Sequence, residues 1–251
     1  MGWSMKKVAR GLGVFCIAAS LFVAVPPASA VSGGTEVDDA TFAADWSFTV
    51  GVGVGSFAFC TGSLVDLSTV ITAAHCVDPA LVGDPPNTVF LGDRDLTTAR
   101  QVAIASIERN PQADSSYLTH DSAILHLAEP VSGVSPIRVA TAAEATGLGA
   151  SVSANFAGFG LTAGGIATTL LHSGSATVAS RSKTWELFGG NVSVCSGDSG
   201  GPLVATLTSG EKVLIGATSF GSPECSGPGI WTDLGADTFI QSAFHPPGTG
   251  T

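Results

Sequence analysis

Short runs of apolar and β-branched residues, separated by turn-forming residues, make up most of this chain after residue 30. Clusters such as Gly-Asp-Pro-Pro-Asn at 83–87 interrupt the runs, and clusters of this kind mark turns. The pattern therefore predicts an all-β protein, and it does not by itself distinguish a sandwich from a barrel. The runs typical of strands are 46–54, 63–73, 88–91, 101–107, 122–127, 151–157, 168–179, 200–206 and 213–219.

Two stretches depart from this pattern. Residues 140–149 are rich in Ala, Thr and Gly and are predicted to be a connector between two parts of the chain. Residues 236–244 are the one convincing helix candidate, and the Pro-Pro pair that follows would end a helix because proline cannot continue it. The residues after this pair are expected to form a loose tail.

The amino-terminal segment has the pattern of a secretory signal peptide. Cations at positions 6, 7 and 10 precede an apolar run over 11–25, and Ala-Ser-Ala follows at 28–30. We expect residues 1–30 to be removed and the protein to be secreted to the extracellular space. The apolar run is short for a bilayer-spanning helix, although a retained anchor is the alternative.

The composition suits a packed, acidic, secreted protein. Hydrophobic residues make up 45% of the 251 positions and charged residues 12%. After residue 30 the chain carries 7 Lys and Arg against 20 Asp and Glu, a net charge of −13. Such a charge repels nucleic acid and anionic membranes, so we expect neither as a partner once the signal is removed.

Three distant residues offer the parts of an activated nucleophile. Ser199 lies in Cys-Ser-Gly-Asp-Ser-Gly-Gly-Pro at 195–202. A serine hydroxyl is a weak nucleophile unless a base takes its proton. His75, in Thr-Ala-Ala-His-Cys, supplies a candidate base, and Asp121, at the start of an apolar run, supplies a carboxylate to orient it.

The order His75, Asp121, Ser199, with these flanking motifs, resembles the trypsin/chymotrypsin-like serine proteases. The resemblance runs from about residue 31 to about residue 244. It implies two antiparallel six-stranded β-barrels with a C-terminal helix. The first barrel is expected over 31–140, and the second, with the helix and the tail, over 141–251.

The same resemblance implies a secreted serine endopeptidase that forms an acyl-enzyme on Ser199. Its substrates are proteins or peptides, with a protein inhibitor as a further candidate partner, and it is expected to be a monomer without cofactor or metal. His75 is the implied base and Asp121 orients it, while Ser219 supports Asp121 through a hydrogen bond. The backbone amides of Gly197 and Ser199 are the implied oxyanion hole.

The substrate pocket is also assigned by this resemblance. Ser193 corresponds to the pocket floor, and Gly221 and Gly229 line its walls. A basic side chain would lose its counter-ion on burial there, because the floor has no acid. Since glycine walls leave room for a ring, we expect cleavage after large apolar or aromatic residues.

Cleavage after residue 30 would expose Val31 in Val-Ser-Gly-Gly. This terminus is similar to the Ile-Val-Gly-Gly of activated family members, and the implied partner of the new ammonium is Asp198. Removal of the signal would then activate the protein directly. The alternative is that the two glycines are only a flexible lead-in and that the cut lies elsewhere.

Four cysteines lie outside the signal and allow three pairings. Secretion favours disulfides, and no two of these cysteines have the short spacing of zinc ligands. The family resemblance implies the pairs Cys60–Cys76 and Cys195–Cys225.

The sequence also allows two alternative interpretations. The Gly-x-Ser-x-Gly around Ser199 fits the nucleophile elbow of α/β-hydrolases, with Asp233 or Asp237 and then His245 completing a triad. Only 52 residues follow Ser199, and no strand–helix alternation is present, which disfavours this reading. The second is a protease-like binding protein that keeps the fold without turnover.

Overall fold

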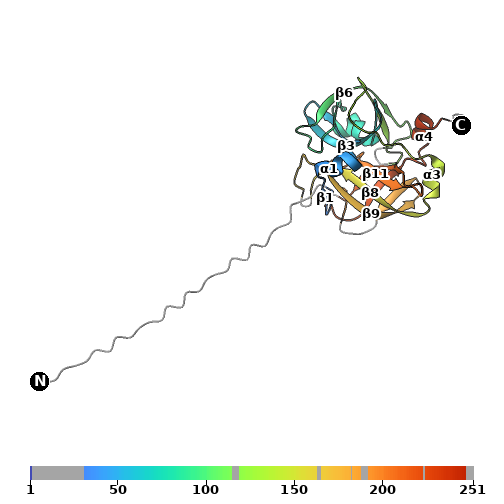
Figure 1. Cartoon of the computed structure of the whole chain (residues 1–251). Coiled ribbons are helices and arrows are strands. Elements are labelled where there is room, and N and C mark those ends of the chain that lie inside the picture. Colours follow the sequence, from blue (N-terminus) through green and yellow to red (C-terminus); the bar gives the residue numbers. More distant parts are fainter. Residues whose placement is uncertain are drawn as a thin grey trace.

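The computed structural model describes residue 1 and residues 31–114, 119–162, 165–181, 183–187, 192–222 and 224–246. Residues 2–30 of the expected signal peptide and the expected tail after residue 246 lie outside these ranges. Two β-barrels lie one against the other, the first blue to green and the second mostly yellow to red (Figure 1). No helix in the described ranges is long and apolar enough to cross a bilayer.

Six antiparallel strands close the first barrel in the order β2-β3-β4-β7-β6-β5. Its strands are β2 (Thr49–Val54), β3 (Phe57–Asp66), β4 (Thr69–Thr72), β5 (Thr88–Leu91), β6 (Arg100–Arg109) and β7 (Ala123–Leu127). Val50, Val52, Leu64 and Leu125 are fully buried in the core of this half. On β2, Val50 and Val52 are two positions apart, and this spacing places both side chains on the same face of the strand.

The second barrel closes in the order β8-β9-β10-β13-β12-β11, because β8 pairs with both β9 and β11. Its strands are β8 (Ser151–Gly158), β9 (His172–Arg181), β10 (Thr184–Leu187), β11 (Pro202–Thr206), β12 (Lys212–Gly221) and β13 (Gly229–Asp233). The short strand β1 (Thr35–Glu36) adds to β9. Phe156, Trp185 and Trp231 fill the core. The expected two-barrel, all-β fold is therefore confirmed.

The stretch at 140–149 connects the two barrels as expected, and the strand expected at 46–54 differs only at its first residues. The connector at 140–149 contains a helix, α3 (Ala142–Gly147), which begins with a capping box between Thr141 and Glu144. The run at 46–54 starts inside a π-helix, η1 (Phe42–Trp46), which follows α1 (Asp39–Thr41), so β2 begins only at residue 49. The three helices α1, η1 and α3 were missed because each is too short to show a helical apolar period.

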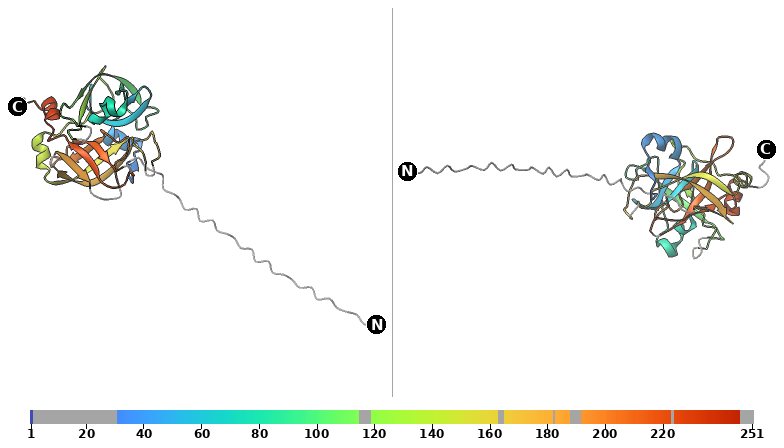
Figure 2. Two further views of the ribbon diagram at one scale, coloured as in Figure 1. Left: turned by 180° about the vertical axis from the view of Figure 1, so that it is seen from behind. Right: turned by 90° about the horizontal axis from the view of Figure 1, so that it is seen from below.

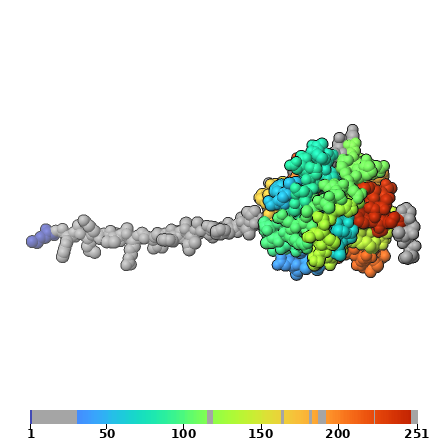
Figure 3. Space-filling view, turned by 90° about the horizontal axis from the view of Figure 1, so that it is seen from above, coloured from blue at the N-terminus to red at the C-terminus, as the bar shows by residue number. Residues whose placement is uncertain are grey.

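The remaining helices follow β4 and β13. The 3-10 helix η2 (Ala74–Val77) follows β4, and α2 (Pro79–Val82) comes directly after it. The expected C-terminal helix is present as α4 (Thr238–Phe244). Asp237, the residue before this helix, hydrogen-bonds to Asn110 and Ser122. The last described segment thus returns to the first half of the molecule, and the red segment lies beside green residues in Figures 2 and 3.

Candidate active site

His75 and Asp121 come together because neighbouring strands carry them. β4 and β7 pair with Thr72 opposite Ala123, so the residues after β4 and before β7 lie at the same end of the barrel. His75 Nδ1 is 2.7 Å from Asp121 Oδ2, and the backbone amide of His75 donates to Asp121 Oδ1 at 2.9 Å. Both oxygens of the carboxylate are therefore used to fix one histidine.

The second barrel completes the surroundings of Asp121. Ser219 Oγ, on β12, donates to Asp121 Oδ2 at 2.6 Å, and Thr232 Oγ1, on β13, donates to the Asp121 carbonyl at 3.1 Å. Burial acts to raise the pKa of Asp121, but the hydrogen bonds from His75 and Ser219 outweigh it, so the pKa is lowered from its ordinary value. The group is a carboxylate at neutral pH.

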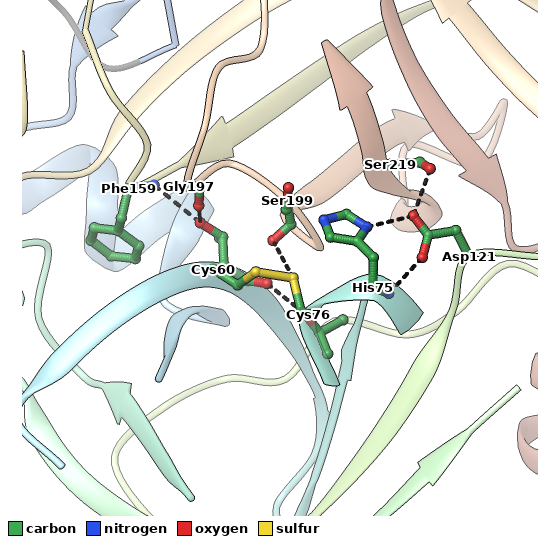
Figure 4. The surroundings of a disulfide bond; sticks show 10 residues. Cys60, His75, Cys76, Asp121, Phe159, Gly197, Ser199 and Ser219 are labelled. Atoms are coloured by element: carbon green, nitrogen blue, oxygen red, sulfur yellow. Dashed lines mark hydrogen bonds and ion pairs between the residues drawn. A yellow bond between two sulfur atoms is a disulfide. The ribbon is translucent and has the colours of Figure 1, made fainter. Parts of the chain in front are cut away.

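Ser199 lies on the other side of the imidazole. Figure 4 shows the ring of His75 between Asp121 and Ser199. The amide of Thr61, on β3, donates to the Ser199 carbonyl at 2.8 Å, and the Cys76 sulfur is 3.7 Å from the same oxygen. A serine from the second barrel is thus held against the first barrel, directly beside the residue that follows His75.

The loop that carries Ser199 depends on its glycines. Gly197 has φ +96° and Gly200 has φ +80°, a region that other residues rarely adopt. A Cβ on Gly200 would lie 2.1 Å from Thr72 Oγ1 and 2.4 Å from the Thr61 carbonyl. Glycine is therefore required where the serine loop meets the first barrel. The Gly197 carbonyl accepts from Thr61 Oγ1 at 2.8 Å, which fixes the loop before Ser199.

Asp198 and Val31 are also brought together. Asp198 is 1% exposed and accepts from the amides of Cys195 at 2.8 Å and Gly160 at 2.9 Å, and from the backbone amide of Val31. Burial raises the pKa of Asp198 to about 7. Val31 is fully buried in the core of the second barrel. The first residue after the expected signal is therefore inside the protein, against a buried acid.

The expected pocket residues lie beside two further side chains, those of Val194 and Trp231. Ser193 is 3% exposed, and its Oγ donates to the Gly227 carbonyl at 3.1 Å. A Cβ on Gly221 would lie 2.9 Å from Val194 Cγ2. A Cβ on Gly229 would lie 3.2 Å from the same methyl and 3.0 Å from the Trp231 ring.

Val194 and Trp231 were not predicted from the sequence as neighbours of the expected pocket residues. Val194 directly follows Ser193 and Trp231 lies two residues after Gly229. Their closeness to the expected pocket along the chain was the one signal that could have found them. The valine methyl lies against both glycines, so it takes part of the space that missing side chains leave.

Both expected disulfides are present. Cys60–Cys76 joins β3 to η2 beside His75, and Cys195–Cys225 joins the serine loop to the segment before β13. In the described part of the chain, the one group of ligand-type side chains close enough for a metal is Cys60, His75 and Cys76. Its two sulfurs form a disulfide, so they are not thiolate ligands.

The alternative interpretation as an α/β-hydrolase is wrong. Its acids and histidine are engaged elsewhere: Asp237 binds Asn110 and Ser122, and His245 Nε2 is 3.1 Å from the Val139 carbonyl. The two antiparallel barrels also exclude the parallel sheet that this fold requires.

Comparisons with known proteins agree with this geometry. The family model described as Trypsin matches residues 33–237. The chain is 30% identical over 199 residues to human kallikrein-4, covering 70% of this chain and 73% of that protein. It is 31% identical over 185 residues to rat chymotrypsin-C, covering 65% and 68%. It is 30% identical over 213 residues to bovine chymotrypsin-like elastase family member 1, covering 76% and 78%.

Proposed function

The chain belongs to the trypsin family of serine endopeptidases, and we propose that it cleaves peptide bonds through an acyl-enzyme on Ser199. The observation that carries the proposal is the His75 imidazole held at 2.7 Å by the buried Asp121 carboxylate, with Ser199 on its other side. His75 takes the proton of Ser199 as the oxygen attacks the carbonyl carbon. It then returns the proton to the leaving amine.

Asp121 has two effects in this mechanism. Its hydrogen bond to Nδ1 fixes the tautomer in which Nε2 accepts the serine proton, and its charge stabilises the imidazolium that forms. Ser219 holds the carboxylate in place. Water then repeats the same steps on the ester and releases the second product.

The backbone amides of Gly197 and Ser199 are proposed to stabilise the oxyanion. The glycine at 197, with φ +96°, lets the loop bend tightly enough for two amides to point to one place. Thr61 holds this loop through the Gly197 carbonyl. Removing one donor of such a pair typically costs about 3 kcal/mol of transition-state stabilisation.

We propose that signal removal itself activates the protein. A free amine on Val31 would place an ammonium beside Asp198, which the Val31 amide already contacts. A buried acid is stabilised strongly by such a partner. Sequencing the amino terminus of the secreted protein tests the idea, because a first residue other than Val31 contradicts it.

The substrate preference is proposed to be apolar. Ser193 at the floor offers no counter-ion for a basic side chain, and Val194 and Trp231 make the surroundings apolar. Because Val194 Cγ2 lies against both wall glycines, leucine-sized side chains are favoured over large rings, in contrast to the aromatic preference expected from glycine walls alone.

Matched peptide anilides test this preference. Val194→Ala should raise the rate of cleavage after Phe relative to Leu, because it removes two methyl groups from the pocket. Faster cleavage after Arg than after either residue by the unmodified enzyme would contradict an apolar pocket.

The protein is proposed to act as a secreted monomer on protein or peptide substrates. A protein inhibitor that binds its active site is a further proposed partner. Labelling with an organophosphonate separates an active enzyme from a protease-like binding protein. Ser199 should be labelled in the mature protein. The Ser199→Ala variant is the control, and an unlabelled mature protein would favour the binding protein.

A further inference from the structure

Asp121 lies in a strained stretch of backbone. His120, directly before it, has φ +52°, a conformation that costs a non-glycine residue free energy. The amide of Ser122 donates to the His120 carbonyl at 2.8 Å and closes a three-residue turn around Asp121. Strained turns of this kind persist only where the surrounding structure holds them.

Buried polar side chains hold this turn. Ser122 Oγ donates to Asp237 Oδ2 at 2.6 Å, and Asn110 Nδ2 lies 3.1 Å from Ser122 Oγ and from each carboxylate oxygen of Asp237. The backbone amide of Asn110 donates to the backbone carbonyl of Ser122 at 3.1 Å. Asn110 and Ser122 are fully buried, and Asp237 is 3% exposed. Buried polar groups with several partners have few alternative arrangements, so the network is rigid.

Asp237 brings the end of the chain into this network. It is the N-cap of α4, and its Oδ1 accepts from the amides of Phe239 at 3.0 Å and Ile240 at 3.4 Å. The same carboxylate thus holds the first turn of α4 and the turn before β7. The network connects three segments: the residue after β6, the turn at Asp121 and the start of α4.

We propose that Asn110, Ser122 and Asp237 are positioning residues that hold the turn so that the Asp121 carboxylate faces His75. They act through Asp121, because their contacts are with the backbone and side chains of the turn. The inference rests on the catalytic role proposed for Asp121. Without the network, the turn relaxes and the carboxylate moves relative to the imidazole.

Ser122→Ala tests this role, because it removes the hydroxyl between Asn110 and Asp237 and leaves the cap of α4 intact. We expect kcat to fall about tenfold with KM changed less than about twofold, since small misplacements of positioned groups affect turnover strongly. The proton NMR signal of the short His75–Asp121 hydrogen bond should shift or broaden. Asp237→Asn, with the same measurements, decides the question if Ser122→Ala does not fold.

Gln241→Ala is the matched control. Gln241 Nε2 donates to the carbonyls of Ala140 and Leu234, both at 2.9 Å, and holds α4 without contacting the turn. This variant should lower the melting temperature while kcat and the NMR signal stay unchanged.

The outcomes separate this inference from the proposed function. If Ser122→Ala keeps the kcat and the NMR signal of the unmodified enzyme, the network only stabilises the fold and the inference is wrong. If the unmodified mature protein does not react with the organophosphonate, the proposed function itself fails and the inference fails with it.

Discussion

Asp198 is a carboxyl group that folding removes from water. Its hydrogen-bond partners in the described ranges are backbone amides of Val31, Gly160 and Cys195. These lower its pKa, but burial dominates and raises it to about 7. A Cβ on Gly158 or Gly160 would reach within 2.6 Å of Asp198 Oδ1, so the backbone encloses the group closely. The residue therefore responds both to pH and to the charge at Val31.

The stability of a chain with a blocked Val31 amine should depend on pH. The ordinary pKa of an aspartate is 3.8 and that of Asp198 in the folded protein is about 7, so between these pH values the folded state binds a proton that the unfolded state lacks. The free energy of unfolding then falls as pH rises from about 4 to 7, by an amount that approaches about 4 kcal/mol. Urea unfolding of a Ser199→Ala chain that begins one residue early, at Ala30, measures this.

Asp198→Asn in the same chain is the control and should lose most of the pH dependence. A chain that begins at Val31 should lose most of it too, because its ammonium keeps the acid ionised. Equal pH profiles for the two starting points would contradict the proposed ion pair.

A second residue-scale prediction concerns Ser219. Its hydroxyl donates to Asp121 Oδ2 at 2.6 Å in a buried site. Hydrogen bonds to charged groups are worth about 1.5–3 kcal/mol, so Ser219→Ala should lower kcat/KM by roughly ten- to hundredfold. Steady-state kinetics with a peptide anilide checks this, and an unchanged kcat/KM would show that Asp121 does not need this support.

At the scale of elements, the Cys195–Cys225 disulfide joins the serine loop to the segment that leads into β13. The described part of this loop before β11, residues 192–201, contains turns and an isolated bridge but no helix or strand. The cross-link and the Asp198 hydrogen bonds hold it together. Since β13 also carries Trp231, the same link fixes the serine loop relative to the proposed substrate pocket.

Replacing both Cys195 and Cys225 by Ser should lower the free energy of unfolding by about 3–4 kcal/mol in the chain-entropy model, for a sequence separation of 30. Urea unfolding in the Ser199→Ala background measures this without autolysis. A loss well below 1 kcal/mol would show that packing alone holds the loop.

The strands were easier to predict than the helices that lie between them. Buried barrel strands show a continuous or alternating apolar pattern, as at 122–127 and 213–219, whereas β10 and β13 contain only two large apolar side chains each and were missed. α3 has mostly small residues, and its stability comes from the Thr141–Glu144 capping box and from Arg138, which pairs with Glu144 at 2.8 Å. Contacts of this kind leave no periodic signal.

At the scale of the molecule, the site forms where the two barrels meet. Thr61, from the first barrel, is fully buried there. Its Oγ1 donates to the Gly197 carbonyl at 2.8 Å and accepts from the Phe159 amide at 3.2 Å. Its backbone amide donates to the backbone carbonyl of Ser199. One residue thus connects β3 to the loop that carries Ser199.

Thr61→Val should lower both stability and activity. It keeps the shape but leaves the buried Phe159 amide and the partly buried Gly197 carbonyl without this partner, and an unsatisfied buried group costs about 1–3 kcal/mol. Thr49→Val is the matched control, because Thr49 Oγ1 is buried and, within the described ranges, has no hydrogen-bond partner. It should be neutral or stabilising in thermal unfolding. Equal losses in the two variants would contradict the role given to Thr61.

The sequence by itself determined the all-β class, and the family resemblance carried by two motifs and their order indicated the three residues proposed for catalysis. Motifs carry such information because the chemistry fixes residue types locally: glycines where a loop must bend, a histidine beside a cysteine, and an acid at the start of a strand. It also indicated Val31 and Asp198 as partners through the same resemblance.

Only the tertiary structure decided what surrounds these residues. It placed Val194 against both wall glycines, Thr61 across the barrel junction and Asp237 beneath the turn at Asp121. These contacts join residues up to 136 positions apart. Such contacts depend on how the two barrels close and pack, so they cannot be predicted from a local sequence pattern.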